Sequence, residues 1–106
     1  MRTILKGIVC AGLGAALPGL AEDRQIGQKD RAFSQTEITI KPGESIVFKN
    51  LDDVTHNVFS ITPGMEFDLR RQAPGGSSRV PFNRAGVAEV RCSIHPKMKL
   101  VVIVRK

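Results

Sequence analysis

Short runs with an apolar residue at every second position dominate the chain beyond residue 36, and turn signals separate them. The run "EITI" (37–40) precedes the Pro-Gly turn "KPGE", and "SIVFKN" (45–50) precedes "LDD". A period of two is typical of a strand with one buried face, whereas an amphipathic helix repeats every three to four residues. No convincing helical period occurs after the first 21 residues. The chain is therefore predicted to be all-β.

The same signals place the other strands. Further extended runs are expected at 24–30, 54–61, 79–83, 87–92 and 99–106. Residues 65–79 are irregular and are expected to form a loop. Pro81 cannot donate to a sheet, which predicts an edge position for its strand. In the middle of the last run, residues at odd and even positions are both apolar. A strand buried on both faces is expected, which predicts a central strand. About 6–8 strands in all predict a two-sheet sandwich.

The N-terminus has the layout of a secretory signal peptide. Arg2 and Lys6 precede an apolar run that ends in small residues, "GIVCAGLGAALPGLA" (7–21). This order is typical of a leader that is removed on export, and the run is shorter than the about 20 apolar residues of a membrane span. An uncleaved anchor is the alternative. We therefore expect a leader over 1–21, a single domain over 22–106, a periplasmic location and no stable membrane association.

Charge and composition narrow the choice of partners. The formal net charge is +6, with 16 Lys and Arg against 10 Asp and Glu, and loss of the two leader cations would lower it to +4. The cations are spread along the chain without a basic block, so nucleic acid is not an expected partner. A mildly basic exported monomer would still be attracted to a partner with an acidic face.

One cysteine would remain after cleavage, Cys92, because Cys10 lies in the leader. Small exported domains usually gain stability from disulfides, and a single cysteine cannot form one internally. An unpaired thiol in an oxidising compartment suggests a special role or a protected position. The alternation of its strand points Cys92 towards the core. It is therefore expected to be protected by burial or by binding.

The segment "RCSIHPKM" places three soft or borderline donor atoms in a short loop between two predicted strands. Cys92 is followed by His95 three positions later and by Met98 three positions after that. The other histidine of the chain, His56, lies in an extended run just after a turn. Loops at one end of a rigid scaffold commonly build a site. The candidate ligands are therefore two imidazoles, one thiolate and one thioether.

This donor set discriminates between metals. Zinc sites use Cys, His and carboxylate ligands in a tetrahedron, and a thioether is a poor ligand for zinc. Two His and one Cys with a weak axial Met is the blue-copper arrangement. Taken singly, the residues have simpler interpretations, as a small buried thiol, a gap-filling thioether and solvated imidazoles. Their combination favours copper.

Two stretches resemble a known family. "ITIKPGESIVFKNLDDVTHNVFS" (38–60) and "FNRAGVAEVRCSIHPKMKLVVIV" (82–104) are similar to cupredoxins of the plastocyanin/amicyanin type and to small exported methylamine-utilisation cupredoxins. The specific motifs are the C-x2-H-P-x-M loop and the Asn that follows the first histidine. The resemblance covers most of the chain beyond the leader. It implies a cupredoxin-like Greek-key β-sandwich with one type 1 copper ion.

The resemblance also implies roles for individual residues. His56, Cys92, His95 and Met98 would bind the copper, with Met98 as the axial ligand. Asn57 would direct its backbone N–H towards the Cys92 sulfur and brace the ligand loop with its side chain. Bonds of this kind around the ligands tune the potential of a metal.

The resemblance further implies that His95 is the ligand nearest the surface and the port for electrons. Pro63, Met65 and Pro96 are expected to form an apolar contact patch around this histidine. Lys97 departs from the resemblance, because amicyanin-like proteins tend to be apolar in this loop. Its charge is expected to change the docking patch.

A periplasmic electron carrier is the function that these features favour, with redox partner proteins bound in small, transient contacts. A copper carrier or buffer that delivers copper to another exported protein would use the same ligands and is the alternative. An enzyme is not expected, because four protein ligands leave no open position for a substrate or water. A metal-free binding domain would leave the combination of donors unexplained.

Overall fold

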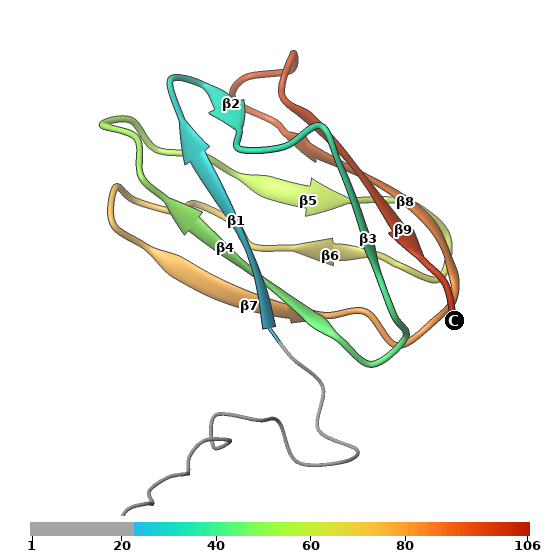
Figure 1. The fold of residues 1–106 in the computed structure, drawn as a ribbon. Helices are drawn as coiled ribbons and strands as arrows, with labels where there is room; N and C mark the ends of the chain where they lie inside the picture. Colours follow the sequence, from blue (N-terminus) through green and yellow to red (C-terminus); the bar gives the residue numbers. More distant parts are fainter. Residues whose placement is uncertain (1–22) are drawn as a thin grey trace, which may run out of the picture.

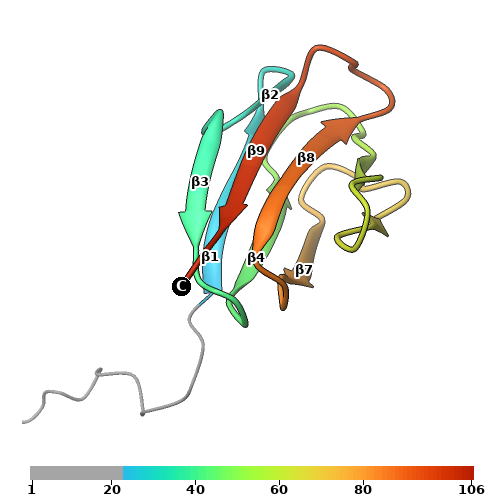
Figure 2. The ribbon, with the colours of Figure 1, turned by 90° about the vertical axis from the view of Figure 1, so that its right-hand side faces the viewer.

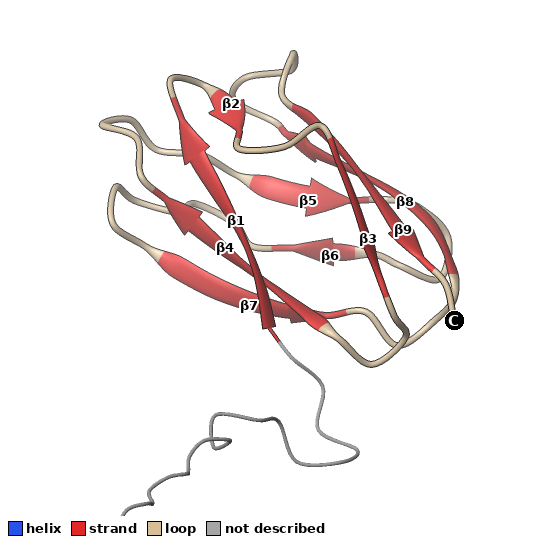
Figure 3. Cartoon of the chain, viewed as in Figure 1, coloured by secondary structure: helices blue, strands red, loops and turns tan. Residues whose placement is uncertain are grey.

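The computed structural model describes residues 23–106, which form strands, turns and loops (Figure 3). The strands of this range are β1 (Asp23–Lys29), β2 (Ala32–Phe33), β3 (Glu37–Ile40), β4 (Ser45–Asn50), β5 (Val58–Ser60), β6 (Phe67–Asp68), β7 (Ser77–Pro81), β8 (Gly86–Cys92) and β9 (Lys99–Val104). The count exceeds the predicted 6–8 because β2 and β6 are only two residues long. The predicted leader, 1–21, lies outside the described residues.

The strands form two sheets that face each other (Figure 1, Figure 2). One sheet has the order β2-β1-β4-β7, and the other has the order β3-β9-β8-β5-β6. Most neighbours are antiparallel, but β1 pairs in parallel with β4, and β3 pairs in parallel with β9. The predicted all-β sandwich is thus confirmed.

Several strand predictions are confirmed in detail. β3 and β4 have the bounds that their alternation predicts. β9 lies between β3 and β8, in agreement with its apolar middle. β7 is an edge strand with Pro81 as its last residue, so the missing N–H of this proline does not interrupt a central ladder.

The predicted loop over 65–79 is wrong in part, because this segment contains β6 and most of β7. Phe67 and Leu69 are partly buried against the core, and Asp68 pairs with Phe59 of β5. Only two residues of β6 are paired, so the period of two is too short to detect in the sequence. The Gly-rich turn that follows β6 makes the start of β7 hard to recognise in the sequence.

The core lies between the inner faces of the two sheets. In β8 the alternation turns Ala88, Val90 and Cys92 inwards, each at most 1% exposed. The Phe48 ring packs edge-on against Phe33, with centroids 6.4 Å apart. Burial of a Phe side chain of this kind contributes about 1.5–3 kcal/mol. The packed core fixes the strand ends from which the loops project.

The two ends of the sandwich carry different loops. Figure 2 shows the β8–β9 loop at one end, with the β1–β2 turn beside it, and the β3–β4 and β7–β8 turns at the other. The chain between β4 and β5 also reaches the first end, since Val58 at the start of β5 lies opposite Cys92 at the end of β8. Over the described range there is no helix long and apolar enough to cross a membrane.

Candidate metal centre

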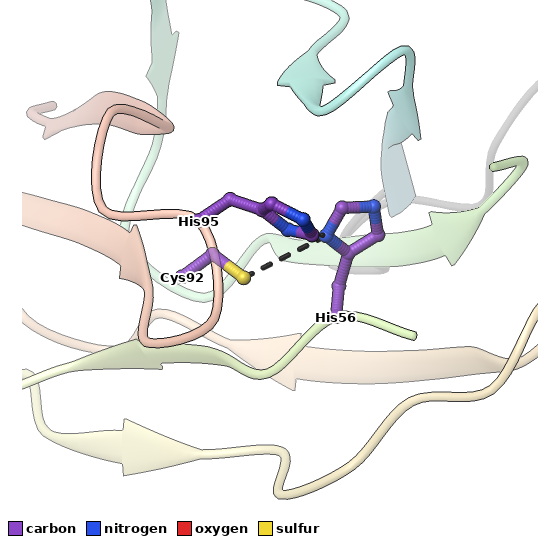
Figure 4. Close-up of side chains that lie close together, drawn as sticks. All are labelled: His56, Cys92 and His95. Carbon is purple, nitrogen blue, oxygen red and sulfur yellow. Dashed lines mark hydrogen bonds between the residues drawn. The ribbon is translucent and has the colours of Figure 1, made fainter. Parts of the chain in front are cut away.

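Three metal-binding side chains converge at the β8–β9 end. Single ligand atoms from His56, Cys92 and His95 all lie within 4.8 Å of one another. The His56 Nδ1 atom is 3.6 Å from the Cys92 Sγ and 3.2 Å from the His95 Nδ1. Figure 4 shows the two rings and the sulfur gathered about one point. Metal–ligand bonds of about 2.0–2.3 Å separate the ligands of one ion by up to about 4.5 Å, so the separations of 3.6 and 3.2 Å suit a single metal ion.

The alternation of side chains along β8 places Cys92 at the site. It is the last residue of the strand, it points inwards, and it is 1% exposed. Its thiol is free. The expectation that this cysteine is buried is confirmed, and its sulfur forms the inner wall of the site.

His56 is fixed by backbone and side chain together. Its N–H and C=O pair with Gln72 through bonds of 3.1 and 2.7 Å, as an isolated bridge just before β5. Its ring is fully buried, and Nε2 lies 2.9 Å from the Asp52 Oδ2 atom. An ionised carboxylate can only accept hydrogen bonds, so Nε2 carries the proton. The Nδ1 lone pair is therefore left facing Cys92 and His95.

Asp52 is a site residue that the sequence prediction missed. Its Oδ2 atom also accepts the Arg31 N–H at 2.8 Å, and its Oδ1 accepts the Asp53 N–H at 3.0 Å. The Arg31 backbone N–H, followed by the His56 side chain, holds the pKa of the Asp52 carboxyl far below its usual range. A carboxylate four residues before a candidate histidine ligand was the signal available in the sequence.

Asn57 connects the two ligand-bearing segments. Its backbone N–H lies 3.3 Å from the Cys92 Sγ, and its side-chain oxygen accepts the Ser93 hydroxyl at 2.7 Å. Its side-chain nitrogen donates to the Asp68 Oδ1 at 2.9 Å. The Arg70 backbone N–H, followed by this amide, holds the pKa of the Asp68 carboxyl below its usual range. One residue thus contacts the Cys92 sulfur, the ligand loop and β6.

The β8–β9 loop is short and tied at several points. The Met98 N–H donates to the His95 carbonyl at 3.0 Å, and the Arg91 guanidinium donates to the Pro96 carbonyl at 3.1 Å. Met98 is 2% exposed and belongs to the core cluster. His95 is only partly buried. Its outer side lies in a shallow hollow, whose lining residues are Arg31, Ile94, His95, Pro96 and Lys97.

The structure does not bring Pro63 and Met65 to His95. β5 runs antiparallel to β8 from the Val58–Cys92 pair, so the residues that follow it lie beside the early part of β8. The Met65 sulfur stands 3.3 Å from the position that a Cβ would occupy on Gly86, the first residue of β8. Pro63 lies between Thr62, whose hydroxyl accepts the Glu89 N–H, and Met65. Of the expected apolar patch, only Pro96 lines the hollow.

Two imidazoles and one buried cysteine sulfur at one end of a β-sandwich form the arrangement of a class of copper proteins. The chain belongs to one such family: residues 21–105 match the family of copper binding proteins described as plastocyanin/azurin. Its cofactor is one copper ion, and the donor set and spacing described above fit that ion.

Individual relatives agree with this family. The chain is 28% identical to the methylamine utilization protein MauL of Methylorubrum extorquens, over 94% of this chain and 89% of the relative. It is 33% identical to amicyanin-alpha of the same organism, over 68% of this chain and 63% of the relative. The crystal structure of amicyanin from Paracoccus versutus superposes with a TM-score of 0.70 and 28% identity, covering 86% of this chain and 87% of amicyanin.

Proposed function

We propose that the chain is a periplasmic one-electron carrier and that His56, Cys92, His95 and Met98 hold a type 1 copper. The convergence of ligand atoms from two imidazoles and one thiol within 4.8 Å carries this proposal. Two observations support Met98 as the fourth ligand: its side chain is buried, and its N–H donates to the His95 carbonyl. A copper ion bound there would supply the Cu(II)/Cu(I) couple.

In this function the protein keeps its metal-binding atoms fixed and shielded from water. His56 and Cys92 are at most 1% exposed, so water does not reach the inner side of the site. Backbone bonds fix His56, and the pairing of Cys92 with Val58 of β5 fixes the cysteine. The Asn57 N–H donates to the Cys92 sulfur, which stabilises negative charge on that atom. A site that rearranges little between two charge states favours fast electron exchange.

The hollow around His95 is the proposed contact surface. One electron would arrive there from a reduced partner protein and leave to an oxidised one, so the carrier is unchanged over a cycle. The exposed Ile94 and Pro96 would provide apolar contact, while Arg31 and Lys97 provide positive charge on either side. This pattern favours a transient partner with an acidic rim. We propose that the carrier is a monomer and not an enzyme.

The first experiment is to express the full chain in a bacterial host and to recover the periplasmic fraction. Sequencing of the N-terminus of the purified protein tests the leader, and we expect it to begin at Glu22. Addition of Cu(II), followed by visible and EPR spectroscopy, tests the site. We expect an intense thiolate-to-copper absorption, narrow parallel hyperfine splitting and a reversible one-electron wave in voltammetry.

Two substitutions test the ligands. Cys92→Ser should abolish the intense absorption, because the transition needs the thiolate. Met98→Leu should keep the colour and shift the potential, because an axial thioether is a weak ligand that tunes the site. A blue Cys92→Ser protein, or an unchanged potential in Met98→Leu, would show that the ligand assignment is wrong.

The rate at which the protein gives up copper distinguishes a copper-delivery protein from an electron carrier. A carrier that uses a closed site should retain Cu(I) against a competing chelator for much longer than one electron exchange takes. A pale spectrum with wide hyperfine splitting, combined with rapid release of copper to the chelator, would reject the electron carrier and support the copper buffer.

A further inference from the structure

We propose that Asp52 is a positioning residue of the copper site, which fixes the metal-binding atom of His56 and lowers the reduction potential through its buried negative charge. This inference rests on the proposed function, because it concerns the same ligands. It adds a carboxylate that lies outside the set of metal ligands and that acts on the metal only through His56.

The geometry leaves Asp52 little freedom. Three hydrogen bonds orient its carboxylate, from the Arg31 N–H, the Asp53 N–H and the His56 Nε2. Its own N–H donates to the Asn50 side chain at 2.9 Å, and the residue is 7% exposed. The bond to His56 is 2.9 Å long, between side chains that are 0% and 4% exposed. Such a carboxylate cannot turn away from the imidazole without losing several bonds.

The backbone of the β1–β2 turn has the conformation that the hydrogen bonds of Asp52 need. Asp30 and Arg31 have φ values of 52° and 56°, in the left-handed region that non-glycine residues seldom adopt. This backbone aims the Arg31 N–H at the Asp52 carboxylate, from a strand pair that contains none of the proposed ligands. The carboxylate therefore joins the two sheets at the metal end, and the unusual backbone is a second observation consistent with a fixed role.

The charge of Asp52 has a defined consequence. A carboxylate that accepts from a ligating imidazole fixes its tautomer and raises its basicity. A more basic ligand and a nearby negative charge stabilise Cu(II) more than Cu(I), which lowers the potential. Because Asp52 is buried, solvent and salt screen this effect weakly.

The test compares two adjacent carboxylates. Asp52→Asn keeps an oxygen that can accept the Nε2–H and removes the charge. Asp53→Asn removes the same charge from the next residue, which is exposed and whose side chain makes no bond to His56. We expect Asp52→Asn to keep the blue spectrum and to raise the ratio of Cu(I) to Cu(II) affinity about tenfold, which corresponds to a potential about 59 mV higher. The shift should persist at high salt.

The control should behave differently. Asp53→Asn should shift the potential less, and the shift should fade as salt is added. Equal shifts in the two variants, or no shift in Asp52→Asn, would overturn the role of Asp52. A wild-type protein without a type 1 spectrum would instead contradict the proposed function.

A measurement on the unmodified protein covers the case in which Asp52→Asn does not fold. Nitrogen-15 NMR of the metal-free chain and of the diamagnetic Cu(I) form reports which ring nitrogen of His56 carries the proton. We expect a slowly exchanging Nε2–H and an unprotonated Nδ1 in both. A proton on Nδ1, or an Nε2–H that exchanges freely with water, would refute the inference without any substitution.

Discussion

The two histidines of the site lie in contrasting surroundings. His56 is fully buried, its backbone is paired and its Nε2 bonds to a buried carboxylate. His95 lies in an exposed loop, is only partly buried and lines an open hollow. The inner histidine is held by the fold, and the outer one reaches the surface, where the proposed partner would contact it.

The largest expected effect comes from removing each imidazole in turn. His95→Gly should lose the blue colour and regain it when free imidazole is added, because the vacated space opens to the surface hollow. His56→Gly should lose the colour and stay pale, because its space is enclosed and leaves Asp52 without its partner. Visible titration with imidazole checks both. Equal rescue of the two variants would contradict the contrast.

A smaller effect is expected for Asn57, which connects the segments that contain His56 and Cys92. Asn57→Ala removes the bonds to Ser93 and Asp68 but keeps the backbone N–H that faces Cys92. Loss of these two exposed bonds should lower the free energy of unfolding by about 1 kcal/mol. Urea unfolding of the metal-free protein measures this. Ser93→Ala, which removes one of the bonds, should cost less than Asn57→Ala.

Asp68 predicts a modest pH dependence of stability. Its pKa is lowered in the folded protein, so the ionised form stabilises the fold above the usual pKa of about 3.9. That stabilisation is lost as the pH falls through the lower, folded value, since protonation then removes it. The contribution should stay below about 1 kcal/mol because the group is exposed. Thermal unfolding of wild type and Asp68→Asn, from neutral pH down to acid, should show curves that converge at low pH.

The smallest effect concerns the cations beside His95. Arg31→Gly suits the positive φ at this position and keeps the N–H that binds Asp52, while it removes the guanidinium. We expect this variant and Lys97→Gln to slow oxidation by hexacyanoferrate(III), an anion, by less than about fivefold. The effect should disappear at high salt, with no change in potential. Arg84→Gln, at the opposite end, is the control and should react like wild type.

Much of the fold could be predicted because the alternation in this chain is regular. β3, β4 and β8 each bury every second side chain, so their faces follow from the sequence. β6 could not be predicted, since two paired residues contain no period. The placement of Met65 required the direction of β5 relative to β8, which is a property of the sheet and not of the local sequence.

The candidate site could also be predicted from the sequence only in part. His56, Cys92 and His95 are rare residue types in this chain, so their grouping could be inferred from composition and spacing. Asp52 is one of 10 acidic residues, and its spacing of four from His56 is a weak signal beside the adjacent Asp53. Its role depends on the backbone of Arg31, 21 residues earlier, and long-range contacts of this kind are visible only in the folded chain.

The parallel pairing of β3 with β9 has a consequence for how the protein is made. Glu37 must meet Val101, so the sheet that holds Cys92 is completed only after the last residues are available. Folds dominated by such distant pairings form slowly. During that interval the sheet does not yet enclose the Cys92 thiol. In the proposed exported carrier, Cys92 would therefore be open to oxidation until β3 and β9 have paired.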